Sequence, residues 1–484
     1  MRNTDATAHF LFSRQIRNAG HTFVKQPDRV LTEGFNGYPF LMHWFLSFLP
    51  RSALERIDKH FSGITDVLHA LVFLALYSFE ILSGYELLLC LGLFLVSPQF
   101  MRPDMSHGLG LSARKPGSFL TTLSLVLILY GLSGNPTFLI AGMFTGSLIF
   151  LTSKFSVQAF LFFSFIISIF TSPTSALLFV GSFLFAILIS FGTYISVLQG
   201  HISHITDFAV RKQYTYLNRQ FFPRFNDMGS INSLLNTFHK SDLIRSMSMN
   251  PYIVGAGLTL GYARIFEIDL ALPSGYAVWA VAAIVCFLGT SLPHLWFLGH
   301  SERYLEHAFV PSSVIIVTSM SVLGEWYTII VGILFVVSLG GVLTNIYVFI
   351  KPNQIYTPAE RDAYDELLNT LKEIEPGVVI AQPLNQGREI VWDTNHRAID
   401  YVVNEGTTKA AIEERERLSP RYPFVTKDIQ WVDNEFSIDW AVFNRMRTDE
   451  SREGILHEPP IEPYFENKYF ALYRFDDIVD SVPT

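Results

Sequence analysis

The chain of 484 residues is half apolar and only 16% charged, and it contains 43 phenylalanines. This composition is typical of a protein that crosses a membrane several times and carries a soluble appendage, and it excludes an ordinary globular enzyme. The net charge of -8 says little, because the charges are concentrated outside the apolar segments. Both cysteines, Cys90 and Cys286, fall in apolar segments, so neither a disulfide framework nor a cysteine zinc site is expected.

Residues 1–61 are amphipathic and are expected to form an extramembrane segment. Residues 5–16 have the spacing of an amphipathic helix, and 38–49 is an apolar stretch too short to cross a bilayer. We expect this stretch to be an interfacial or re-entrant helix, with Trp44 and Phe45 at the level of the lipid headgroups. No hydrophobic stretch follows the polar first residues, so neither a signal peptide nor a first anchoring helix is expected there.

Residues 62–350 are expected to form a transmembrane helical domain of about ten spans. A bilayer core needs about 20 apolar residues per helix, so the shorter segments need polar flanks or tilt. The predicted spans lie near 62–77, 81–96, 118–132, 137–151, 155–171, 175–198, 251–265, 276–298, 308–323 and 327–350. If successive spans cross the membrane in alternating directions, most of the polar residues lie on one face of it. That face holds the N-terminal segment, the loops 97–117 and 199–250, the turn 299–307 and the tail, and function is therefore expected there.

Residues 351–484 are expected to form a soluble α/β domain. Residues 358–374 have helical spacing with one apolar face, and 378–381 is a short buried-strand pattern. Two further short strands are predicted at 440–443 and 469–473. The fold class predicted from the whole sequence is a polytopic α-helical membrane protein with a small C-terminal α/β soluble domain.

Several of these features together resemble the integral-membrane glycosyltransferases of the GT-C superfamily. They are Asp5 in a short amphipathic first segment, the stretch LTEGFNGYP at 31–39, the many spans, and the helix-then-strand tail. Those enzymes carry an essential acid in a first extracytoplasmic loop and a second such loop two helices later. A large flexible loop follows their seventh helix, and many end in a soluble domain on the same face. Here Asp5 falls in the first segment, RPDMSH at 102–107 in the second, and 199–250 in the place of the large loop.

This sequence departs from the family's pattern at its start. Family members usually begin with a membrane helix before the first loop, and they often have two adjacent acidic residues where this chain has Asp5-Ala6. The resemblance implies a multi-pass protein, embedded in the lipids of the cell membrane, with its long loops and C-terminal domain outside the cytoplasm. It also implies transfer of a sugar from a polyprenyl-phosphate donor to a glycan, lipid or protein acceptor.

Such a transfer needs a base for the acceptor hydroxyl and positive charge for the departing phosphate. Asp5 is the candidate catalytic base, and the alternative is that it only caps the helix that follows. Asp104 is a candidate ligand for a divalent metal and His107 a candidate for steering the donor phosphate. Both also fit an ordinary polar turn.

Two further positions are candidates for binding substrate. Glu33 lies in a glycine-rich loop that can bring backbone close to a ligand, although it also fits a solvated loop acid. In the turn 299–307, Arg303 can grip a lipid-linked phosphate bidentately, with Tyr304 beside it. The alternative is an arginine that reaches to the headgroups and pairs with a neighbouring glutamate.

Two polar segments have the composition of a saccharide- or lipid-binding surface. The loop 199–250 interleaves basic and aromatic residues and could cover a polyprenyl phosphate or a sugar acceptor, although basic runs beside a membrane more often bind anionic lipid. The stretch WDTNHR at 392–397 is polar enough to touch a saccharide, but a lone histidine in such a stretch is more often structural. Motifs for nucleic-acid binding, Walker-type glycine loops and zinc-ligand spacings are absent from the sequence.

The distribution of basic residues conflicts with the sidedness that the resemblance implies. The long-loop face carries Arg102, Arg114, Lys115, Arg211 and Lys212, and the positive-inside rule would place that face in the cytoplasm. We follow the layout of the family, because phosphate-binding sites also need cations.

Two other functions stay open from the sequence. One is a transporter or flippase for a lipid-linked or polar substrate, although the spans contain few charges and no internal repeat. The other is a non-catalytic membrane scaffold whose tail binds a partner. Replacement of Asp5 separates the scaffold from the enzyme, because a scaffold would lose at most a helix cap.

Overall fold

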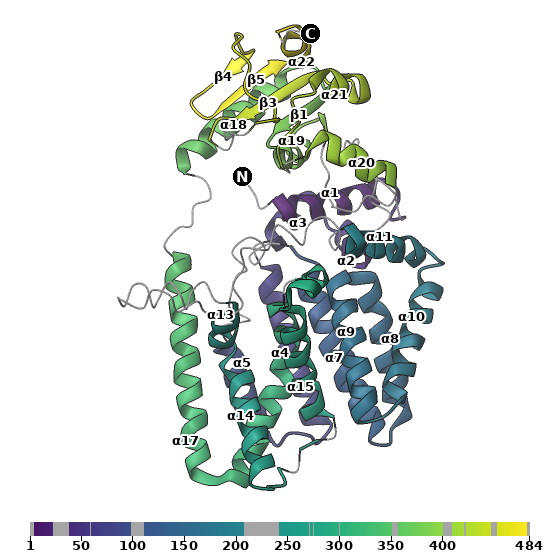
Figure 1. Cartoon of the computed structure of the whole chain (residues 1–484), viewed down its shortest axis with the longest axis vertical. Coiled ribbons are helices and arrows are strands. Elements are labelled where there is room, and N and C mark those ends of the chain that lie inside the picture. The colour runs from purple at the N-terminus through teal and green to yellow at the C-terminus, as the bar shows by residue number, and fades with distance from the viewer. Residues whose placement is uncertain are drawn as a thin grey trace.

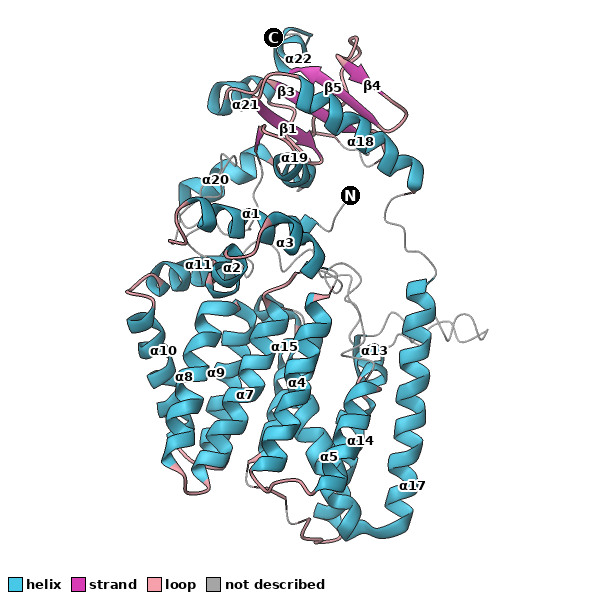
Figure 2. Ribbon diagram, turned by 180° about the vertical axis from the view of Figure 1, so that it is seen from behind, coloured by secondary structure: helices cyan, strands magenta, loops and turns pink. Residues whose placement is uncertain are grey.

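A computed structural model describes residues 4–22, 38–58, 60–97, 111–207, 242–270, 272–273, 275–299, 301–350, 357–399, 409–420, 423–446 and 453–481. Its helices form a bundle aligned with the long axis of the molecule, and a small domain with a sheet lies at one end (Figure 1). Three N-terminal helices lie between the bundle and this domain: α1 (Thr4–Asn18), α2 (Leu41–Ser47) and α3 (Arg51–Asp58) (Figure 2). The mostly helical fold with a small C-terminal sheet confirms that part of the predicted fold class.

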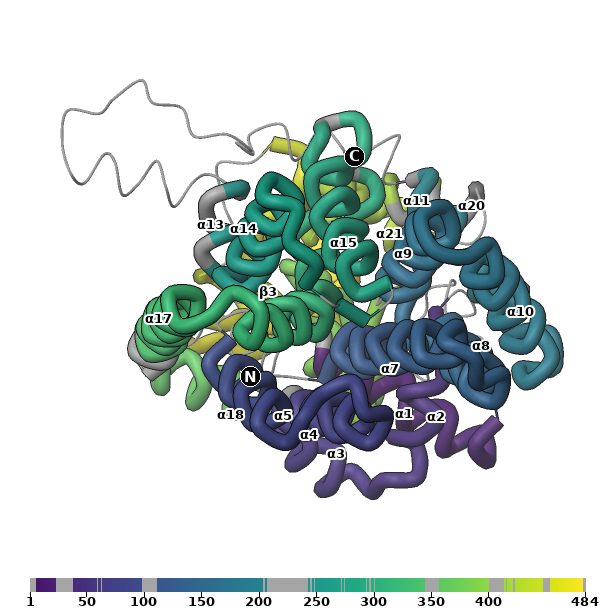
Figure 3. The backbone as a smooth tube through the Cα atoms, turned by 90° about the horizontal axis from the view of Figure 1, so that it is seen from below, coloured from purple at the N-terminus to yellow at the C-terminus, as the bar shows by residue number. Residues whose placement is uncertain are grey.

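The apolar segments predicted as spans form the helices of the bundle. The long members are α4 (Phe61–Ser78), α5 (Gly84–Leu95), α7 (Arg114–Leu132), α8 (Pro136–Thr152), α9 (Lys154–Phe170), α10 (Thr174–Ile189), α14 (Pro251–Ile265), α15 (Tyr276–Thr290) and α17 (Phe309–Ile350). Shorter pieces are α11 (Tyr194–Asp207), α13 (Asp242–Met249), η4 (Pro293–Leu298), α16 (Glu302–Leu305) and η5 (Glu306–Ala308). Seen from the end of the bundle, α10 and α17 lie on opposite sides (Figure 3).

Four of the predicted spans end or continue differently in the structure. The segment 175–198 breaks after Ile189, where Gly192 takes a φ of 82° and α11 begins. The segment 276–298 is helical only to Thr290 and continues as η4. The last two segments form a single element, α17, that is kinked at Gly324 with a φ of 77°, a conformation that glycine adopts readily.

Within the described residues, two helical stretches are long and apolar enough to cross a membrane, Arg114–Leu132 and Glu302–Leu343. A bent pair, Arg51–Asp58 with Gly63–Ser78, also meets the requirement if its two parts, which meet at 65°, are taken as one span. Five further apolar helices, α5, α8, α9, α10 and α15, have 12 to 17 residues. These lengths fall short of the roughly 20 residues that a straight span needs, so the number of crossings stays a prediction.

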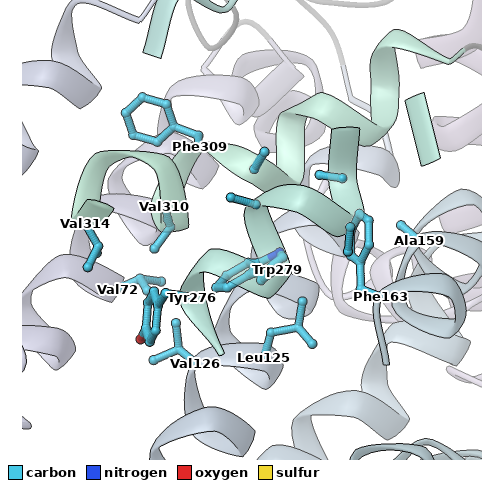
Figure 4. Close-up of a cluster of buried hydrophobic side chains, with 14 of the residues drawn as sticks. Val72, Leu125, Val126, Ala159, Phe163, Tyr276, Trp279, Phe309, Val310 and Val314 are labelled. Atoms are coloured by element: carbon cyan, nitrogen blue, oxygen red, sulfur yellow. The ribbon is translucent and has the colours of Figure 1, made fainter. Parts of the chain in front are cut away.

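Large apolar side chains fill the centre of the bundle. Trp279 and Tyr276 of α15 lie against Leu125 and Val126 of α7, with Phe163 of α9 beside them (Figure 4). All five are almost completely buried.

Small residues bring neighbouring helices of the bundle close together. A Cβ atom placed on Gly142 of α8 would lie 2.7 Å from Cγ1 of Ile128 on α7, and the Ser124 hydroxyl donates to the Gly142 carbonyl at 2.8 Å. Close helix approach at small residues is typical of helices that pack in lipid.

The C-terminal domain is a mixed sheet with helices on both faces. Its elements are α18 (Pro358–Glu373), β1 (Val378–Gln382), η6 (Leu384–Gln386), α19 (Gly387–Asp393), β2 (Arg397–Ala398), α20 (Lys409–Leu418), α21 (Ile429–Phe436), β3 (Trp440–Asn444), β4 (Phe465–Glu466), β5 (Phe470–Arg474) and α22 (Phe475–Ser481). Among the described residues the sheet has five strands in the order β2-β1-β3-β5-β4. The pairs β1–β2 and β1–β3 are parallel, and the remaining pairs are antiparallel.

Alternate side chains of the central strands reach the two faces of this sheet. Val379 and Val442 pack on Leu367 of α18, whereas Ile380 and Ala441 face the core that includes α21 and α22. The helix predicted at 358–374 and the strands predicted at 378–381, 440–443 and 469–473 are confirmed. The two-residue strands β2 and β4 were not predicted, because so short a run carries no alternation.

Candidate functional site

Helix α1 separates the bundle from the C-terminal domain, and both of its sides are covered. Phe10 of α1 packs on Trp392 of α19 with ring centroids 5.1 Å apart. On another side His9 stacks on His43 of α2 with ring centroids 5.0 Å apart. The side chains that give residues 5–16 their helical spacing therefore pack on α2 and on α19, and these contacts hold α1 between the bundle and the C-terminal domain.

The buried histidines of α1 and α2 form a hydrogen-bonded pair. Nδ1 of His43 lies 3.2 Å from the Pro39 carbonyl, which can only accept, so this nitrogen carries the proton. Nε2 of His43 must then accept from Nδ1 of His9, at 2.8 Å. Burial, and next the charge of His9, lower the pKa of His43 well below its usual value, and the hydrogen bond to Pro39 opposes this shift only in part. His43 is therefore neutral at physiological pH.

The neutral His43 predicts a loss of stability on acidification. Below about pH 6.5 the unfolded chain binds a proton at this residue that the folded chain does not, so the free energy of unfolding falls by at most about 1.4 kcal/mol per pH unit. Above that pH the contribution is fully present. Melting curves between about pH 7.5 and about pH 5.5 should show this fall, and His43→Gln should flatten it. An unchanged slope in the variant would assign the acid sensitivity to other groups.

Charged residues around Trp392 join α1 and α3 to the C-terminal domain. The guanidinium carbons of Arg14 and Arg51 lie 5.1 and 4.8 Å from the centroid of the Trp392 ring, within the range of cation–π attraction. Arg51 donates to Asp393 at 2.6 Å and to Glu55 at 2.9 Å. The indole nitrogen of Trp392 also donates to Glu55, at 3.2 Å.

A polar cavity of about 390 Å³ opens beside this cluster, between α1, α3 and the C-terminal domain. It is lined by Arg14, Arg51, Leu371, Lys372, Ile374, Pro376, Trp392, Asp393, Thr394 and Asn395. Part of the stretch 392–397, singled out in the sequence for its polarity, thus lines a cavity. His396 is structural instead: it is buried, its Nε2–H donates to the Leu371 carbonyl at 2.6 Å, and its Nδ1 accepts from the Gly377 amide at 3.1 Å.

The turn 299–307 lies beside the N-terminal end of α9, close to the first segment of the chain. Phe155 contacts Tyr304, with ring centroids 4.8 Å apart, and the guanidinium carbon of Arg303 lies 5.7 Å from the Phe155 centroid. The preceding Lys154 lies over the ring of Tyr38 at 5.8 Å, and Tyr38 stacks in turn on Phe12 of α1 at 5.3 Å. Tyr304 is fully buried, and its hydroxyl donates to the Leu298 carbonyl at 3.2 Å.

The remaining candidate residues are placed only in part. Asp5 lies in the first turn of α1, one helical turn before His9, and its side chain is outside the description. Glu33, Asp104 and His107 lie outside the described residues altogether. In the part of the chain that the structure covers, no group of three or more His, Cys, Asp or Glu side chains could hold a metal ion.

Two ion pairs lie at the N-terminal end of α7, and neither was predicted from the sequence. Nζ of Lys115 lies 3.1 Å from Asp66 of α4, and Nη2 of Arg114 lies 3.2 Å from Glu306 of η5. All four side chains are less than a quarter exposed. The basic pair was visible in the sequence, but its acidic partners are 49 and about 190 positions away, and only tertiary packing identifies them.

Breaking one of these pairs from one side should destabilise the protein. Lys115→Met leaves the carboxylate of Asp66 without this partner in an environment of low polarity, and we expect a loss of about 1–3 kcal/mol. The double variant Lys115→Met with Asp66→Leu should recover most of that loss, because it removes both charges. Thermal unfolding in one detergent measures all variants, and a harmless single substitution would show that water screens the pair.

Helix α1, the turn with Arg303 and the polar cavity thus all lie near the end of the bundle that faces the C-terminal domain. No protein-family model and no curated protein matches this chain.

Proposed function

We propose that this chain is a multi-pass membrane glycosyltransferase that moves a sugar from a polyprenyl-phosphate donor to an acceptor. The reaction would take place at the end of the bundle that the C-terminal domain covers. One observation carries the proposal. The first segment, with Asp5, and the turn with Arg303 are far apart in the sequence, yet both contact the N-terminal end of α9. The first segment does so through Tyr38, which contacts Lys154, and the turn does so through Arg303 and Tyr304, which contact Phe155.

The proposed chemistry assigns one role to each of these segments. Asp5 accepts the proton of the acceptor hydroxyl while that oxygen bonds to the anomeric carbon of the donor sugar. The bond between the anomeric carbon and the phosphate oxygen breaks, and polyprenyl phosphate leaves with the electron pair. Arg303 is proposed to stabilise the negative charge of the leaving phosphate, which a guanidinium does through paired hydrogen bonds.

Exposed apolar side chains on the bundle support its placement in a membrane. Soluble proteins rarely expose large contiguous apolar patches. On the outer helices α9, α10 and α17, half or more of each of the following side chains is exposed: Phe165, Ile169, Leu177, Leu184, Leu188, Ile333, Val336 and Val337. A lipid environment would bury all of them.

Single cysteines test the membrane arrangement. Ser133 is exposed in the connection between α7 and α8, at the end of the bundle away from the C-terminal domain, and Asn434 is exposed on α21. Both native cysteines are buried, so they should give little background with an impermeant thiol reagent. In intact cells, Asn434→Cys should react and Ser133→Cys should react only after permeabilisation. Labelling of both from the same side would contradict the arrangement, and the reverse result would place the working face in the cytoplasm.

Transfer itself is tested with the purified full chain in liposomes. The donor is a polyprenyl-phosphate hexose with a radiolabelled sugar, presented with a mixture of lipid and oligosaccharide acceptors. The proposal predicts loss of label from the donor, release of polyprenyl phosphate, and label in an acceptor. Movement of intact donor between leaflets without release of polyprenyl phosphate would instead identify the flippase alternative.

A further inference from the structure

We propose that the outer sides of α11 and α2 form an interfacial surface that lies in the headgroup region of a lipid leaflet, the one nearer the C-terminal domain. The proposal rests on the membrane placement in the proposed function, but not on the transfer reaction. Three features carry it: the direction of α11, the exposed apolar side chains of both helices, and the backbone conformation of Phe191.

Helix α11 turns away from the axis of the bundle. The chain leaves α10 after Ile189, and α11 runs across the end of the bundle in both side views, at the height of α2 (Figures 1 and 2). On its inner side Tyr194 is buried and packs on Phe150 of α8 and Phe183 of α10, with ring centroids 5.4 and 5.9 Å apart. A helix that lies across the ends of lipid-embedded helices lies in the plane of the membrane surface.

The exposed apolar side of α10 continues onto α11. Leu184 and Leu188 of α10 are more than half exposed. The same spacing of three or four residues leads to Phe191 and Ile195, which are 98% and 49% exposed, and Ile202 follows two turns later at 57%. The side of α10 that would face lipid is therefore continuous with the outer side of α11, and such a continuous apolar patch marks a contact with a partner or a membrane.

Phe191 occupies a backbone position that disfavours it. It follows Ser190 at the end of α10 with a φ of 50°, the left-handed conformation in which glycine is usual after a helix. A bulky side chain with this φ is an outlier. Its ring gains almost no burial within the protein in return. A lipid leaflet would bury the ring and offset the cost of this conformation.

Helix α2 presents aromatic side chains of the kind found at membrane surfaces. Phe45 and Phe48 are more than half exposed, and the ring of Trp44 contacts each of them with centroids 5.1 Å apart. The indole N–H of Trp44 donates to the His21 carbonyl at 3.2 Å. Aromatic residues with one apolar and one polar end gather at the level of the headgroups. The sequence predicts this place for α2, whereas it assigns α11 to a span and a polar loop.

Both helices are connected to the N-terminal end of α9. Nε2 of Gln158 on α9 lies 3.1 Å from Nε2 of His201 on α11. Lys154 at the start of α9 lies over the ring of Tyr38, which precedes α2. Arg303 also contacts this end of α9. The interfacial surface would therefore put Arg303 near the lipid phosphates, where its role in the proposed function requires it to be.

Spin labels on single cysteines measure this arrangement with the full chain in liposomes of phosphatidylcholine and phosphatidylglycerol. Phe191→Cys, Ile202→Cys and Phe45→Cys carry the label on the interfacial surface. Leu184→Cys is the matched control on the exposed side of α10, and Asn434→Cys is the control in water. Collisions with oxygen and with a water-soluble nickel chelate give the depth of each label. The three labels should lie about 5–10 Å into the membrane surface, the label at Leu184 deeper, and the label at Asn434 outside.

Three results would overturn the inference. Labels at Phe45 and Phe191 that meet the nickel chelate as freely as the label at Asn434 would place both helices in water, and a deep label at Leu184 would then keep the membrane placement. Dipolar broadening between labels at Phe191 of separate molecules would show that a second copy covers α11. A label at Leu184 in water would reject the membrane placement itself. The expected depths without any sugar transfer would keep the interfacial surface and reject the enzyme reaction.

Discussion

Replacement of Asp5 by asparagine is expected to lower the rate of sugar transfer by about 10²- to 10⁴-fold, the usual contribution of a positioned general base. Asparagine has nearly the same size but cannot take the proton of an acceptor hydroxyl. The expected loss therefore lies in kcat, while the KM for the donor stays near the wild-type value. Initial rates of polyprenyl phosphate release from reconstituted protein measure both quantities.

The choice of asparagine also separates catalysis from helix stability. Asp5 lies in the first turn of α1, where its charge interacts with the helix dipole, so Asp5→Asn should lower the free energy of unfolding only slightly, by about 0.3–1 kcal/mol. Asp5→Glu keeps a carboxylate and should retain more activity than Asp5→Asn. Full activity in Asp5→Asn would reduce Asp5 to a structural residue of the first turn of α1, and the base would have to be sought in another residue.

Long periodic or apolar runs were the parts of the fold that could be predicted. Each predicted span forms a helix over most of its length, because an apolar run of this length, without the alternation of a strand, favours a buried helix. The ends were predicted less well. The helix over 175–198 stops at Ile189, and a glycine with positive φ lets the chain turn into α11. Such a turn is decided by local backbone conformation, which the hydrophobic run does not reveal.

The candidate site was predicted in single residues but not as an arrangement. The residue types of Arg303 and of the stretch 392–397 made them candidates for binding. In the structure Arg303 lies over the ring of Phe155, and part of the stretch 392–397 lines a cavity. The cavity itself could not be foreseen. Its residues come from α1, α3 and the C-terminal domain, and more than 300 positions separate Arg51 from Lys372 in the sequence. Only the docking of the domain on α1 makes them neighbours.

Trp392→Ala is expected to have the largest effect on that docking, with a loss of about 3–5 kcal/mol in the free energy of unfolding. The side chain is 1% exposed, has the guanidinium groups of Arg14 and Arg51 near its ring, and packs on Phe10 of α1. Its removal leaves a void at the junction and takes both cation–π contacts with it. Thermal unfolding gives the size of the loss, and hydrogen exchange of the amides of α1 shows where it falls.

Trp431→Ala is the matched control, because Trp431 belongs to the same domain but lies on α21, against Phe436 and Arg417. It should destabilise the domain without raising exchange in α1, whereas Trp392→Ala should raise it strongly. If both variants leave α1 equally protected, the junction does not depend on Trp392. If the expected difference appears, Trp392→Ala should also lose sugar transfer. The reason would be positional: Trp392 helps to hold α1, and α1 carries Asp5.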